Sequence, residues 1–479
     1  MEKYYGNLEQ QLRACCRSGQ TPLHMPGHKR RVSVTGAIDS TLDFTEVEET
    51  DDLHHAEGIL KEAMERTAAL YGAKRTWYLV NGSTCGNLAG IAAMTRQGDE
   101  VVVGRNCHRS IFHALQLRGL KVHWVMPAYI EEYGIYGSLS PAAVEHALQK
   151  YPHTRAVILT SPTYEGVISD IASIVTAAHE RNIPVFVDEA HGAHLGFGSF
   201  PENAVQCGAD LVVQSPHKTL FSATQTAWLH LNGNLVSQEK VEQQLGIFET
   251  SSPSYPLLMS LDGCTKAWHD HGGEFASRWM NMLAEFDREA GGLSNLSILW
   301  HDGKDQRDGC IFSYDPGKIM IHSPVSGEKL LHLLHDQYRF TLEMAEGNNV
   351  LAMTSAADDP AEIHRFAQAL HEIDDCISEG EEKRDDPAAM QRLPAAVMNI
   401  QDAVESNHVS LPLFEAEGKI AGEYVFLYPP GIPMIVPGEV IEPAQLDFFR
   451  RAMQKGYRIR TSESADDHVL VCRENQEYE

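Results

Sequence analysis

The sequence predicts an α/β fold in which helices cover both faces of a mostly parallel sheet, followed by smaller α+β units. Between residues 59 and 290, short apolar segments alternate with segments of helical periodicity, an order typical of parallel strands joined by crossover helices. The apolar segments are almost continuously hydrophobic, as expected of strands that are buried on both faces. After about residue 290 the regular alternation ends, which indicates a change of domain.

Six short apolar segments are the predicted strands of this sheet. They cover residues 76–80, 100–104, 121–126, 155–160, 184–188 and 210–215. Helices are predicted between most of them, at residues 86–95, 110–119, 140–150 and 171–182. A further helix is expected before the first strand, from Ile59 to Leu70, because its apolar residues recur with helical spacing and Gly72 is a suitable C-cap.

These patterns divide the chain into four parts. We expect an N-terminal arm at residues 1–58, a large α/β domain at 59–290, a small α+β domain at 291–377 and a C-terminal domain at 388–479. The segment 378–387 is densely charged and has no periodicity, which is typical of a surface linker.

Composition argues against several classes of function. Lys and Arg number 39 against 66 Asp and Glu, a net charge of −27, whereas nucleic-acid binding needs cations that displace counterions from phosphates. No stretch of about 18 apolar residues occurs, so no membrane span is expected, and the polar start of the chain predicts no signal peptide. Nine cysteines without CxxC spacing favour free thiols in a reducing cytoplasm.

The segment VFVDEAHGAH at residues 185–194 contains the four letters that name a class of helicases. A nucleotide-driven motor also needs a phosphate-binding sequence of the form GxxxxGKS or GxxxxGKT. The Gly-Lys pairs of this chain are followed by Asp305, Ile319 and Ile420, none of which carries the required hydroxyl group. The sequence therefore argues against a helicase.

Polar residues after the predicted strands favour a different site. Asp188 ends the fifth predicted strand and Lys218 follows the sixth, so both are expected at the sheet edge where ligands of α/β folds bind. A turn of small residues at 79–87 precedes a helix that is expected to begin near Asn87, and the free N–H groups of a helix start bind anions. An anion site, an aspartate and a lysine together suggest pyridoxal phosphate.

Each of these residue types suits one part of that cofactor. A lysine amine forms a Schiff base with the aldehyde, and an aspartate keeps the pyridine nitrogen protonated, which makes the ring a better electron sink. His108 also follows a strand and offers a flat ring that can stack on the cofactor. Alone, Lys218 would be interpreted as a surface residue and His108 as a structural one, and only their combination favours a functional role.

His191 and His194 are an alternative pair of metal ligands. Three residues apart, they could share one face of a helix. The sequence offers no third ligand, so no metal is expected.

A series of short motifs resembles those of the Orn/Lys/Arg decarboxylase family. They are HMPGHK (24–29), DDLHHAEGILKEA (51–63), VNGSTCGN (80–87), RNCHRS (105–110), TSPTYEG (160–166), VDEAHGAH (187–194), SPHKTL (215–220), SSPSYPLLMSLD (251–262), and YPPGIP with the PGE that ends at Glu439. The resemblance spans almost the whole chain and corresponds to the short bacterial form, without a wing domain. It implies a fold-type-I pyridoxal-phosphate enzyme with a smaller α+β C-terminal part.

The resemblance also implies roles for individual residues. Lys218 is expected to be the Schiff-base lysine, Asp188 to pair with the pyridine nitrogen, and His108 to stack on the ring. His191 is expected near the phenolic oxygen of the cofactor. The residues expected to contact its phosphate are Ser83, Thr84, Cys85, Ser215 and His217. Glu439 is a candidate to hold the distal cationic group of the substrate.

The activity implied by the resemblance is α-decarboxylation of arginine, lysine or ornithine, which yields CO₂ and an amine of the polyamine pathways. A homodimer or dimer-based oligomer is also implied, with residues 251–255 and the N-terminal arm reaching a neighbouring active site. An aminotransferase, an aldolase or a non-catalytic relative on the same scaffold are the alternatives. An aminotransferase would need an arginine clamp in its small domain, and none is identified.

Three positions depart from the family pattern. Pro216 removes a backbone N–H beside the expected phosphate site. Arg30 and Arg31 follow HMPGHK where a glycine is usual nearby, so the arm is expected to pack differently. Glu165 replaces a common aromatic residue, and it is expected either to be solvated or, less readily, to face a cationic substrate.

Overall fold

The computed structural model describes most of the chain in several segments. They are residues 19–23, 51–299, 309–377, 392–428, 432–454, 458–465 and 467–473. The HMPGHK motif, Arg30, Arg31 and the expected linker at 378–387 lie outside the described residues, and what the sequence predicts for them stays a prediction.

A seven-stranded sheet forms the centre of the large domain, with the strand order β2-β11-β10-β9-β7-β3-β4. Its strands are β2 (Arg75–Leu79), β3 (Glu100–Gly104), β4 (Lys121–Val125), β7 (Thr154–Thr160), β9 (Val185–Asp188), β10 (Leu211–Gln214) and β11 (Ala227–Leu231). The neighbours from β10 to β4 run parallel to one another. The mostly parallel sheet and the six predicted strands are confirmed.

Strand β11 is the one member of this sheet that the sequence prediction misses. It runs antiparallel to both β10 and β2. It follows β10 through a loop and the four-residue helix α7 (Pro216–Thr219), not through a long crossover helix. The strand-helix alternation that predicts the other strands is therefore missing here.

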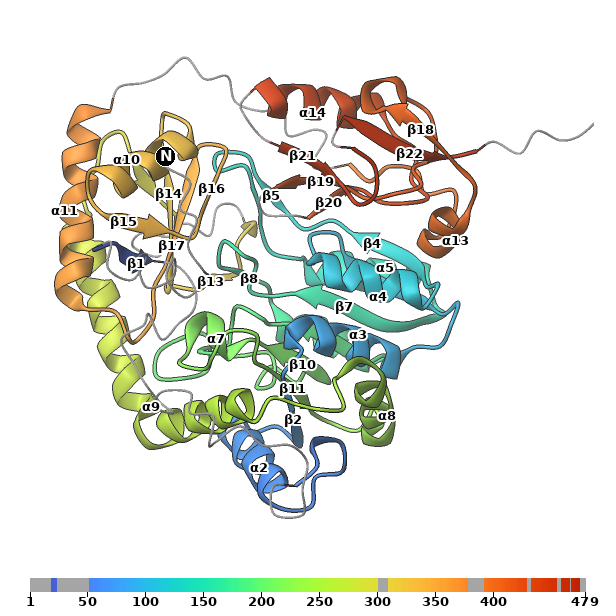
Figure 1. Ribbon diagram of the computed structural model, residues 1–479, viewed down its shortest axis with the longest axis horizontal. Coiled ribbons are helices and arrows are strands. Elements are labelled where there is room, and N and C mark those ends of the chain that lie inside the picture. The colour runs from blue at the N-terminus through green and yellow to red at the C-terminus, as the bar shows by residue number, and fades with distance from the viewer. Residues whose placement is uncertain are drawn as a thin grey trace, which may run out of the picture.

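Helices cover both faces of the sheet (Figure 1). The four predicted crossover helices are confirmed as α3 (Gly82–Met94), α4 (Arg109–Leu117), α5 (Pro141–Lys150) and α6 (Ile171–His179), and the helix before the first strand as α2 (Ile59–Tyr71). Gly72 caps α2 in a left-handed conformation, as expected. Helix α3 begins at Gly82, earlier than the predicted start near Asn87, so Ser83, Thr84 and Cys85 belong to its first turn.

The continuous hydrophobicity of the strands is explained by two separate cores. Val101 and Val103 of β3 point into a core on one face of the sheet, whereas Val102 points into the core on the other face. Successive side chains of a strand alternate between its faces, so a strand that is covered on both sides needs apolar residues at every position.

The small domain contains an antiparallel sheet of four strands in the order β12-β14-β17-β16. These are β12 (Ser297–Ile298), β14 (Lys318–His322), β17 (Asn349–Met353) and β16 (Met344–Glu346), accompanied by helices α10 (Gly327–Asp336) and α11 (Pro360–Cys376). Helix α9 (Tyr255–Glu289), about 50 Å long at 1.5 Å per residue, runs from the large domain to α11 (Figure 1). The α+β character is confirmed, and the predicted boundaries stay predictions.

Part of the N-terminal arm lies on the small domain of its own chain. Strand β1 (Thr21–Leu23) pairs in parallel with β15 (Phe340–Leu342). Thr21 also donates a hydrogen bond through Oγ1 to Glu362 of α11. This short segment of the arm therefore has its partners within one chain, and the expected contact with a neighbouring subunit stays a prediction for the rest.

The C-terminal part has a hydrophobic core of its own. It contains the strand pair β18 (His408–Pro412) and β22 (His468–Cys472), and a sheet of β20 (Pro433–Ile435), β19 (Val425–Tyr428) and β21 (Arg458–Thr461). Helices α13 (Ile400–Glu405) and α14 (Pro443–Gln454) complete it, and it lies beside α4 and β4 of the large domain (Figure 1).

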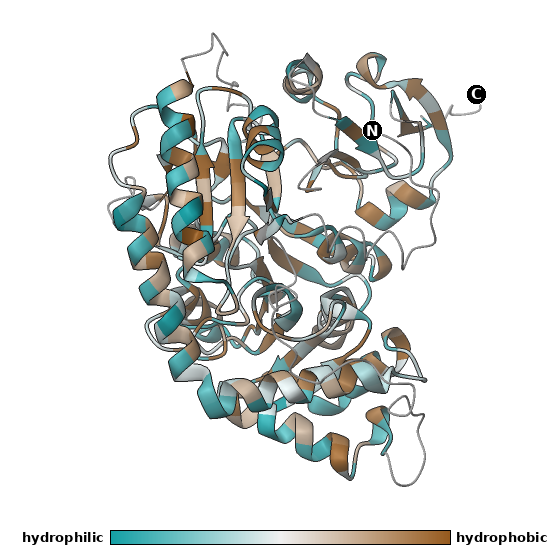
Figure 2. Ribbon diagram, turned by 60° about the vertical axis from the view of Figure 1, so that its left-hand side comes forward, coloured by the Kyte–Doolittle hydropathy of each residue, from teal (hydrophilic) through white to brown (hydrophobic). Residues whose placement is uncertain are grey.

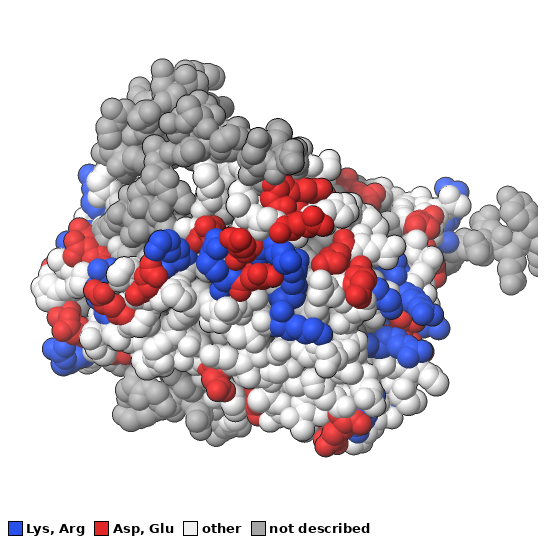
Figure 3. Space-filling model, turned by 90° about the horizontal axis from the view of Figure 1, so that it is seen from below, with Lys and Arg blue, Asp and Glu red and all other residues white. Residues whose placement is uncertain are grey.

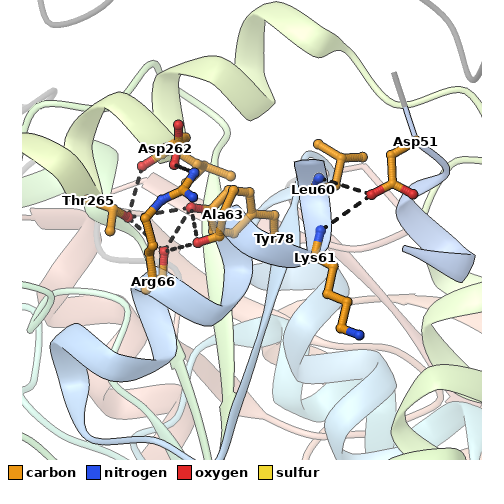
Figure 4. A network of polar contacts seen from close by, with 10 residues as sticks. Asp51, Leu60, Lys61, Ala63, Arg66, Tyr78, Asp262 and Thr265 are labelled. Carbon is orange, nitrogen blue, oxygen red and sulfur yellow. Dashed lines mark hydrogen bonds and ion pairs between the residues drawn. The ribbon is translucent and has the colours of Figure 1, made fainter. Parts of the chain in front are cut away.

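Two of the sequence motifs meet where helices α2 and α9 begin (Figure 4). Oδ2 of Asp51 accepts hydrogen bonds from the N–H groups of Gly58 and Leu60, at 2.8 and 3.0 Å, and so caps α2. Arg66 of α2 pairs with Asp262 of α9 at 2.8 Å. Asp51 therefore fixes the start of α2, and Asp262 joins α9 to α2.

The molecular surface is mixed in character. The outer sides of the long helices are mainly hydrophilic (Figure 2), and basic and acidic side chains are interspersed across the face drawn in Figure 3. Among the described residues, the structure contains no helix with the length and apolar character needed to span a membrane.

Candidate active site

Four sequence segments bring the predicted site residues to one edge of the large sheet. The first turn of α3 follows β2, His108 follows β3, Asp188 ends β9, and Lys218 lies in α7 directly after β10. These strands point in the same direction, so their carboxyl ends meet at the edge where α/β folds bind ligands.

Asp188 is a buried carboxylate whose neighbours are neutral donors. Its Oδ2 accepts from Nδ2 of Asn87 at 2.9 Å, and its Oδ1 accepts from the N–H of Ala190 at 3.1 Å. Asn87 also contacts Oγ of Ser110, in α4, at 2.8 Å. Within the described residues Asp188 makes no ion pair, although its side chain is almost fully removed from solvent. A buried carboxylate in this state favours a cation beside it.

Lys218 is connected to the small domain through His191. Nζ of Lys218 lies 3.0 Å from Nε2 of His191, and Nδ1 of His191 lies 2.8 Å from Nζ of Lys318, the first residue of β14. Burial lowers the pKa of Lys218. It also lowers the pKa of His191, well below the usual value of a histidine. Burial also lowers the pKa of Lys318, to about 8. The ring of Tyr164 lies against His191, with centroids 4.6 Å apart.

His108 is the N-cap residue of α4. Its Nδ1 lies 2.8 Å from Oγ of Ser110, which fixes the ring at the start of the helix. The residue is exposed to solvent. Desolvation by the surrounding protein lowers the pKa of His108 to about 4. A neutral, flat ring is therefore presented beside Asp188 and Lys218.

The residues predicted to contact a phosphate are in different situations. Ser83 and Thr84 lie in the first turn of α3, whose N–H groups have no partner within the helix. The thiol of Cys85 instead donates to Glu249 at 3.3 Å, so only its backbone remains for an anion. Oγ of Ser215 is buried and has no hydrogen-bond partner among the described residues. Nδ1 of His217 lies 2.7 Å from the carbonyl of Thr226.

Pro216 occupies the first position of α7, where the N–H of any residue would lack an intrahelical partner. Proline at this position, a departure from the family pattern, therefore costs α7 no hydrogen bond.

Glu439 is engaged by Arg105, which directly follows β3. The guanidinium lies 3.3 Å from Oε2 of Glu439, and the same oxygen accepts from the N–H of Val436 at 2.9 Å. Arg105 also donates to the carbonyl of Pro433 at 2.6 Å. This geometry favours a role in holding the C-terminal part to the large domain, and the expected contact with a substrate stays a prediction.

Two further glutamates, Glu165 and Glu189, are buried. Glu165 is almost fully buried near Lys318, and burial raises its pKa, so the expectation of a solvated side chain is wrong. Glu189 accepts from the N–H of Ala204 at 2.8 Å and from Nε2 of Gln214 at 2.7 Å. It thereby fixes the loop that follows Asp188.

The two histidines considered as metal ligands have separate partners. His191 lies between two lysines, whereas Nε2 of His194 lies 2.8 Å from Oδ1 of Asp315. Within the described part of the chain, no group of three or more His, Cys, Asp or Glu residues is arranged to hold a metal.

Sequence reasoning misses Asn87 as a site residue, and it misses Lys318, Tyr164 and Glu343. Tyr164 donates through its hydroxyl to Glu343, next to the His191 cluster. Asn87 ends the motif VNGSTCGN, but the sequence assigns it only the expected start of a helix and no contact with Asp188. Lys318 and Glu343 belong to the small domain, so no local pattern connects them with strand ends far earlier in the chain.

Known proteins resemble this chain over most of its length. The sequence matches the Orn/Lys/Arg decarboxylase major domain at residues 16–295 and the C-terminal domain of the same family at residues 383–458. An arginine decarboxylase of Bacillus subtilis is 30% identical over 460 residues, 93% of each chain. The uncharacterized protein YaaO of the same species is 34% identical over 435 residues, 87% of this chain and 88% of that one.

Solved structures show the same fold. The lysine decarboxylase LdcF of Francisella novicida superposes with a TM-score of 0.77 at 19% identity, over 88% of this chain and 73% of that one. An aminotransferase of Bacillus subtilis, which acts on ureidoglycine and glyoxylate, gives 0.56 at 14% identity, over 74% and 92%. The fold is that of the fold-type-I pyridoxal-phosphate enzymes, and the matches along the sequence show that the chain belongs to the Orn/Lys/Arg decarboxylase family.

Proposed function

We propose that this protein is a pyridoxal-phosphate-dependent decarboxylase that removes the α-carboxylate of a basic amino acid as CO₂. The observation that carries this proposal is the position of a buried Asp188, which makes no ion pair among the described residues, and of the amine of Lys218 at neighbouring strand ends. Arginine is the favoured substrate, because relatives that are 30% identical over more than nine-tenths of the chain are named arginine decarboxylases. Lysine and ornithine are the other candidates.

The residues present suit this cofactor. A protonated pyridine nitrogen would supply the cation that the buried carboxylate of Asp188 otherwise lacks. Oγ of Ser215, which has no partner among the described residues, can bond to a phosphate oxygen. The first turn of α3, with Ser83 and Thr84, directs N–H groups and the positive end of the helix dipole toward an anion.

In this proposal each site residue has one task. Lys218 would bind the aldehyde carbon, Asp188 would hold the proton on the ring nitrogen, and His108 would stack on the ring. His191 would lie near the phenolic oxygen. The phosphate would be held by Ser83, Thr84, the backbone of Cys85, Ser215 and His217.

Bond breaking at Cα needs an electron sink, and bound pyridoxal phosphate supplies it by accepting the electron pair of the Cα–carboxylate bond. Asp188 sustains this capacity because its charge keeps the ring nitrogen protonated. Lys218 is prepared as a nucleophile because burial lowers its pKa and so favours the free amine. Lys218 or a histidine on the cofactor face would be the donor that returns a proton to Cα.

The proposal is tested by comparing the wild type with Lys218→Ala and with Lys329→Ala, an exposed lysine of α10. The wild type and Lys329→Ala are expected to show the visible absorption of bound cofactor and to release CO₂ and an amine from arginine, lysine or ornithine. Lys218→Ala is expected to lose both signals. A visible band that persists in Lys218→Ala would refute the cofactor assignment, and formation of an oxoacid in place of an amine would favour an aminotransferase.

We further propose that the protein acts in the cytoplasm as a homodimer or a dimer-based oligomer that shares its active sites. Its described cysteines are all free, which suits a reducing compartment. Ser251 and Ser252 are exposed at the loop before α9 and are available to a second subunit. Light scattering of the full-length protein should give a multiple of the 53.2 kDa chain mass, and a monomer under assay conditions would contradict the proposal.

A further inference from the structure

Lys318 is a second buried lysine at the candidate active site. It begins β14 of the small domain, and only 2% of its surface is exposed. The imidazole of His191 bridges it to Lys218, with 2.8 Å between Nδ1 and Nζ of Lys318 and 3.0 Å between Nε2 and Nζ of Lys218. A side chain of the small domain thus reaches the proposed cofactor lysine through one ring.

The chemistry of the bridge restricts its protonation. A neutral imidazole has one N–H donor and one acceptor nitrogen, whereas an ammonium group can only donate. His191 can therefore accept from one ammonium group and must donate to the other nitrogen. Of Lys218 and Lys318, only one can be a cation while both contacts are hydrogen bonds, and the other must be a free amine.

The surroundings favour Lys318 as the cation. Its Nζ lies 3.4 Å from the carbonyl oxygen of Tyr164, which gives it a second acceptor, and 5.7 Å from the centroid of the Tyr164 ring. The acidic groups that act on Lys318 are Asp315, Glu343 and Glu165, whereas those that act on Lys218 are Asp188 and Glu343. Two contacts that stabilise a cation, a carbonyl oxygen and an aromatic ring face, therefore lie beside Lys318.

We propose that Lys318 is a positioning residue that acts through His191 to keep the side-chain nitrogen of Lys218 uncharged. Its ammonium donates to Nδ1 of His191, so Nε2 carries the proton and donates to the lone pair of Lys218. The inference rests on the proposed function, in which Lys218 binds pyridoxal phosphate. It goes beyond that function because it gives the small domain a part in setting the proton affinity of the cofactor lysine.

Removal of the Lys318 charge should raise the proton affinity of the Lys218 nitrogen. A nearby cation disfavours a second positive charge, so its loss raises the pKa of Lys218. The other ionisable groups that face this cluster stay in place in such a variant. They are His108 and His217 beside His191, Asp188 and Glu343 beside Lys218, and Asp315, Glu343 and Glu165 beside Lys318.

The test is a pH titration of the visible absorption of the holoenzyme in the wild type, Lys318→Met, Lys318→Arg and the exposed control Lys329→Met. In Lys318→Met the midpoint of the spectral transition is expected to move up by about one pH unit, which is the size of a single close charge. Lys318→Arg keeps the cation and is expected to restore the midpoint toward the wild type. Lys329→Met is expected to leave it unchanged. If Lys318→Met does not fold, Lys318→Gln, which removes the charge and keeps a donor, is titrated in its place.

The possible outcomes separate the inference from the proposed function. A midpoint that stays unchanged or moves down in Lys318→Met, while the wild type has a band that depends on Lys218, would overturn the inference alone. If Lys318 has only a structural role, the melting temperature of Lys318→Met falls but the midpoint does not move, and this outcome also overturns the inference. A wild type without a Lys218-dependent band would overturn the proposed function, and the inference with it.

Discussion

At the scale of single residues, the site depends on a buried carboxylate that makes no ion pair within the described residues. The carboxylate of Asp188 keeps its position through Asn87 and the N–H of Ala190, both of which are neutral donors. These hydrogen bonds hold the carboxylate in place but do not neutralise it. The charge is therefore available to stabilise a proton on a bound ring.

Asp188→Asn tests that reasoning. The asparagine carbonyl can still accept from Asn87, so the fold and the covalent attachment at Lys218 are expected to persist. Without the negative charge the ring nitrogen loses its proton, and kcat is expected to fall by about 100-fold or more. Asp170→Asn, at the N-cap of α6, is the matched control and should keep wild-type kcat. Equal kcat values for Asp188→Asn and the wild type would contradict the assigned role.

The pair of His194 and Asp315 illustrates a buried charge that does have a partner. Both side chains are fully buried, and Nε2 of His194 lies 2.8 Å from Oδ1 of Asp315, which also accepts from the N–H of Gly317. Burial raises the pKa of Asp315, but the imidazole and the N–H outweigh it and the pKa is lowered overall. The pair connects the loop after β9 with the turn before β14.

Asp315→Asn should therefore cost stability in a pH-dependent way. A lowered folded pKa means that the ionised carboxylate stabilises the protein above the usual Asp pKa and that this contribution is lost as the pH falls through the folded value. We expect a loss of about 1.5–3 kcal/mol in the free energy of unfolding at pH 7 and a smaller loss below about pH 4. Urea unfolding at both pH values measures it, with the exposed Asp447→Asn as control. The same deficit at both values would argue against an ionised pair.

At the scale of secondary-structure elements, the position of α3 is set by close packing on the sheet. A Cβ atom at Gly90 would lie 2.4 Å from Cε2 of Phe186 in β9, and one at Gly86 would lie 2.5 Å from Cγ2 of Val213 in β10. The two glycines let the helix approach the strands that carry Asp188 and lead to Lys218. This contact fixes the first turn of α3 relative to both residues.

Gly90→Ala and Gly246→Ala form a matched pair of helix substitutions. Alanine favours a helix over glycine by about 1 kcal/mol, and a Cβ at Gly246 in α8 meets no atom within 4 Å, so Gly246→Ala should stabilise the protein by up to about that amount. Gly90→Ala should instead destabilise it by about 1–3 kcal/mol, because Phe186 must move. Thermal unfolding of both variants checks the contrast. A stabilised Gly90→Ala would show that α3 can shift freely.

The elements also explain which parts of the structure the sequence can predict. The crossover strands and helices are predictable because an apolar run covered on two faces is a strong local signal. Strand β11 is not, since no long crossover helix separates it from β10. Asp188 and Lys218 are found as residues at strand ends, whereas Lys318 reaches the site only through tertiary contact with His191. The pairing of Glu439 with Arg105 depends equally on domain packing.

At the scale of the whole molecule, one hydrophobic core runs from the large domain into the small domain, the C-terminal part has a core of its own, and buried polar contacts add to this packing. The small domain contacts the site through Lys318, and the C-terminal part is attached through Arg105, which lies three residues before His108 in the chain. The guanidinium also lies over the rings of Phe112 and Trp124. Packing of the C-terminal part is therefore coupled to the loop that presents His108.

Glu439→Gln distinguishes this structural role from a role in substrate binding. The substitution leaves Arg105 as a buried cation without a counterion, which is expected to cost about 3–5 kcal/mol in the free energy of unfolding. Replacing both partners, in Arg105→Met with Glu439→Gln, should cost less than the sum of the single changes. KM for the basic amino acid is expected to stay close to the wild-type value, measured with a protein that is folded at the assay temperature. Unchanged stability together with a KM raised by tenfold or more would instead assign Glu439 to the substrate's distal cation, because an ion pair with the substrate contributes to its binding without supporting the fold.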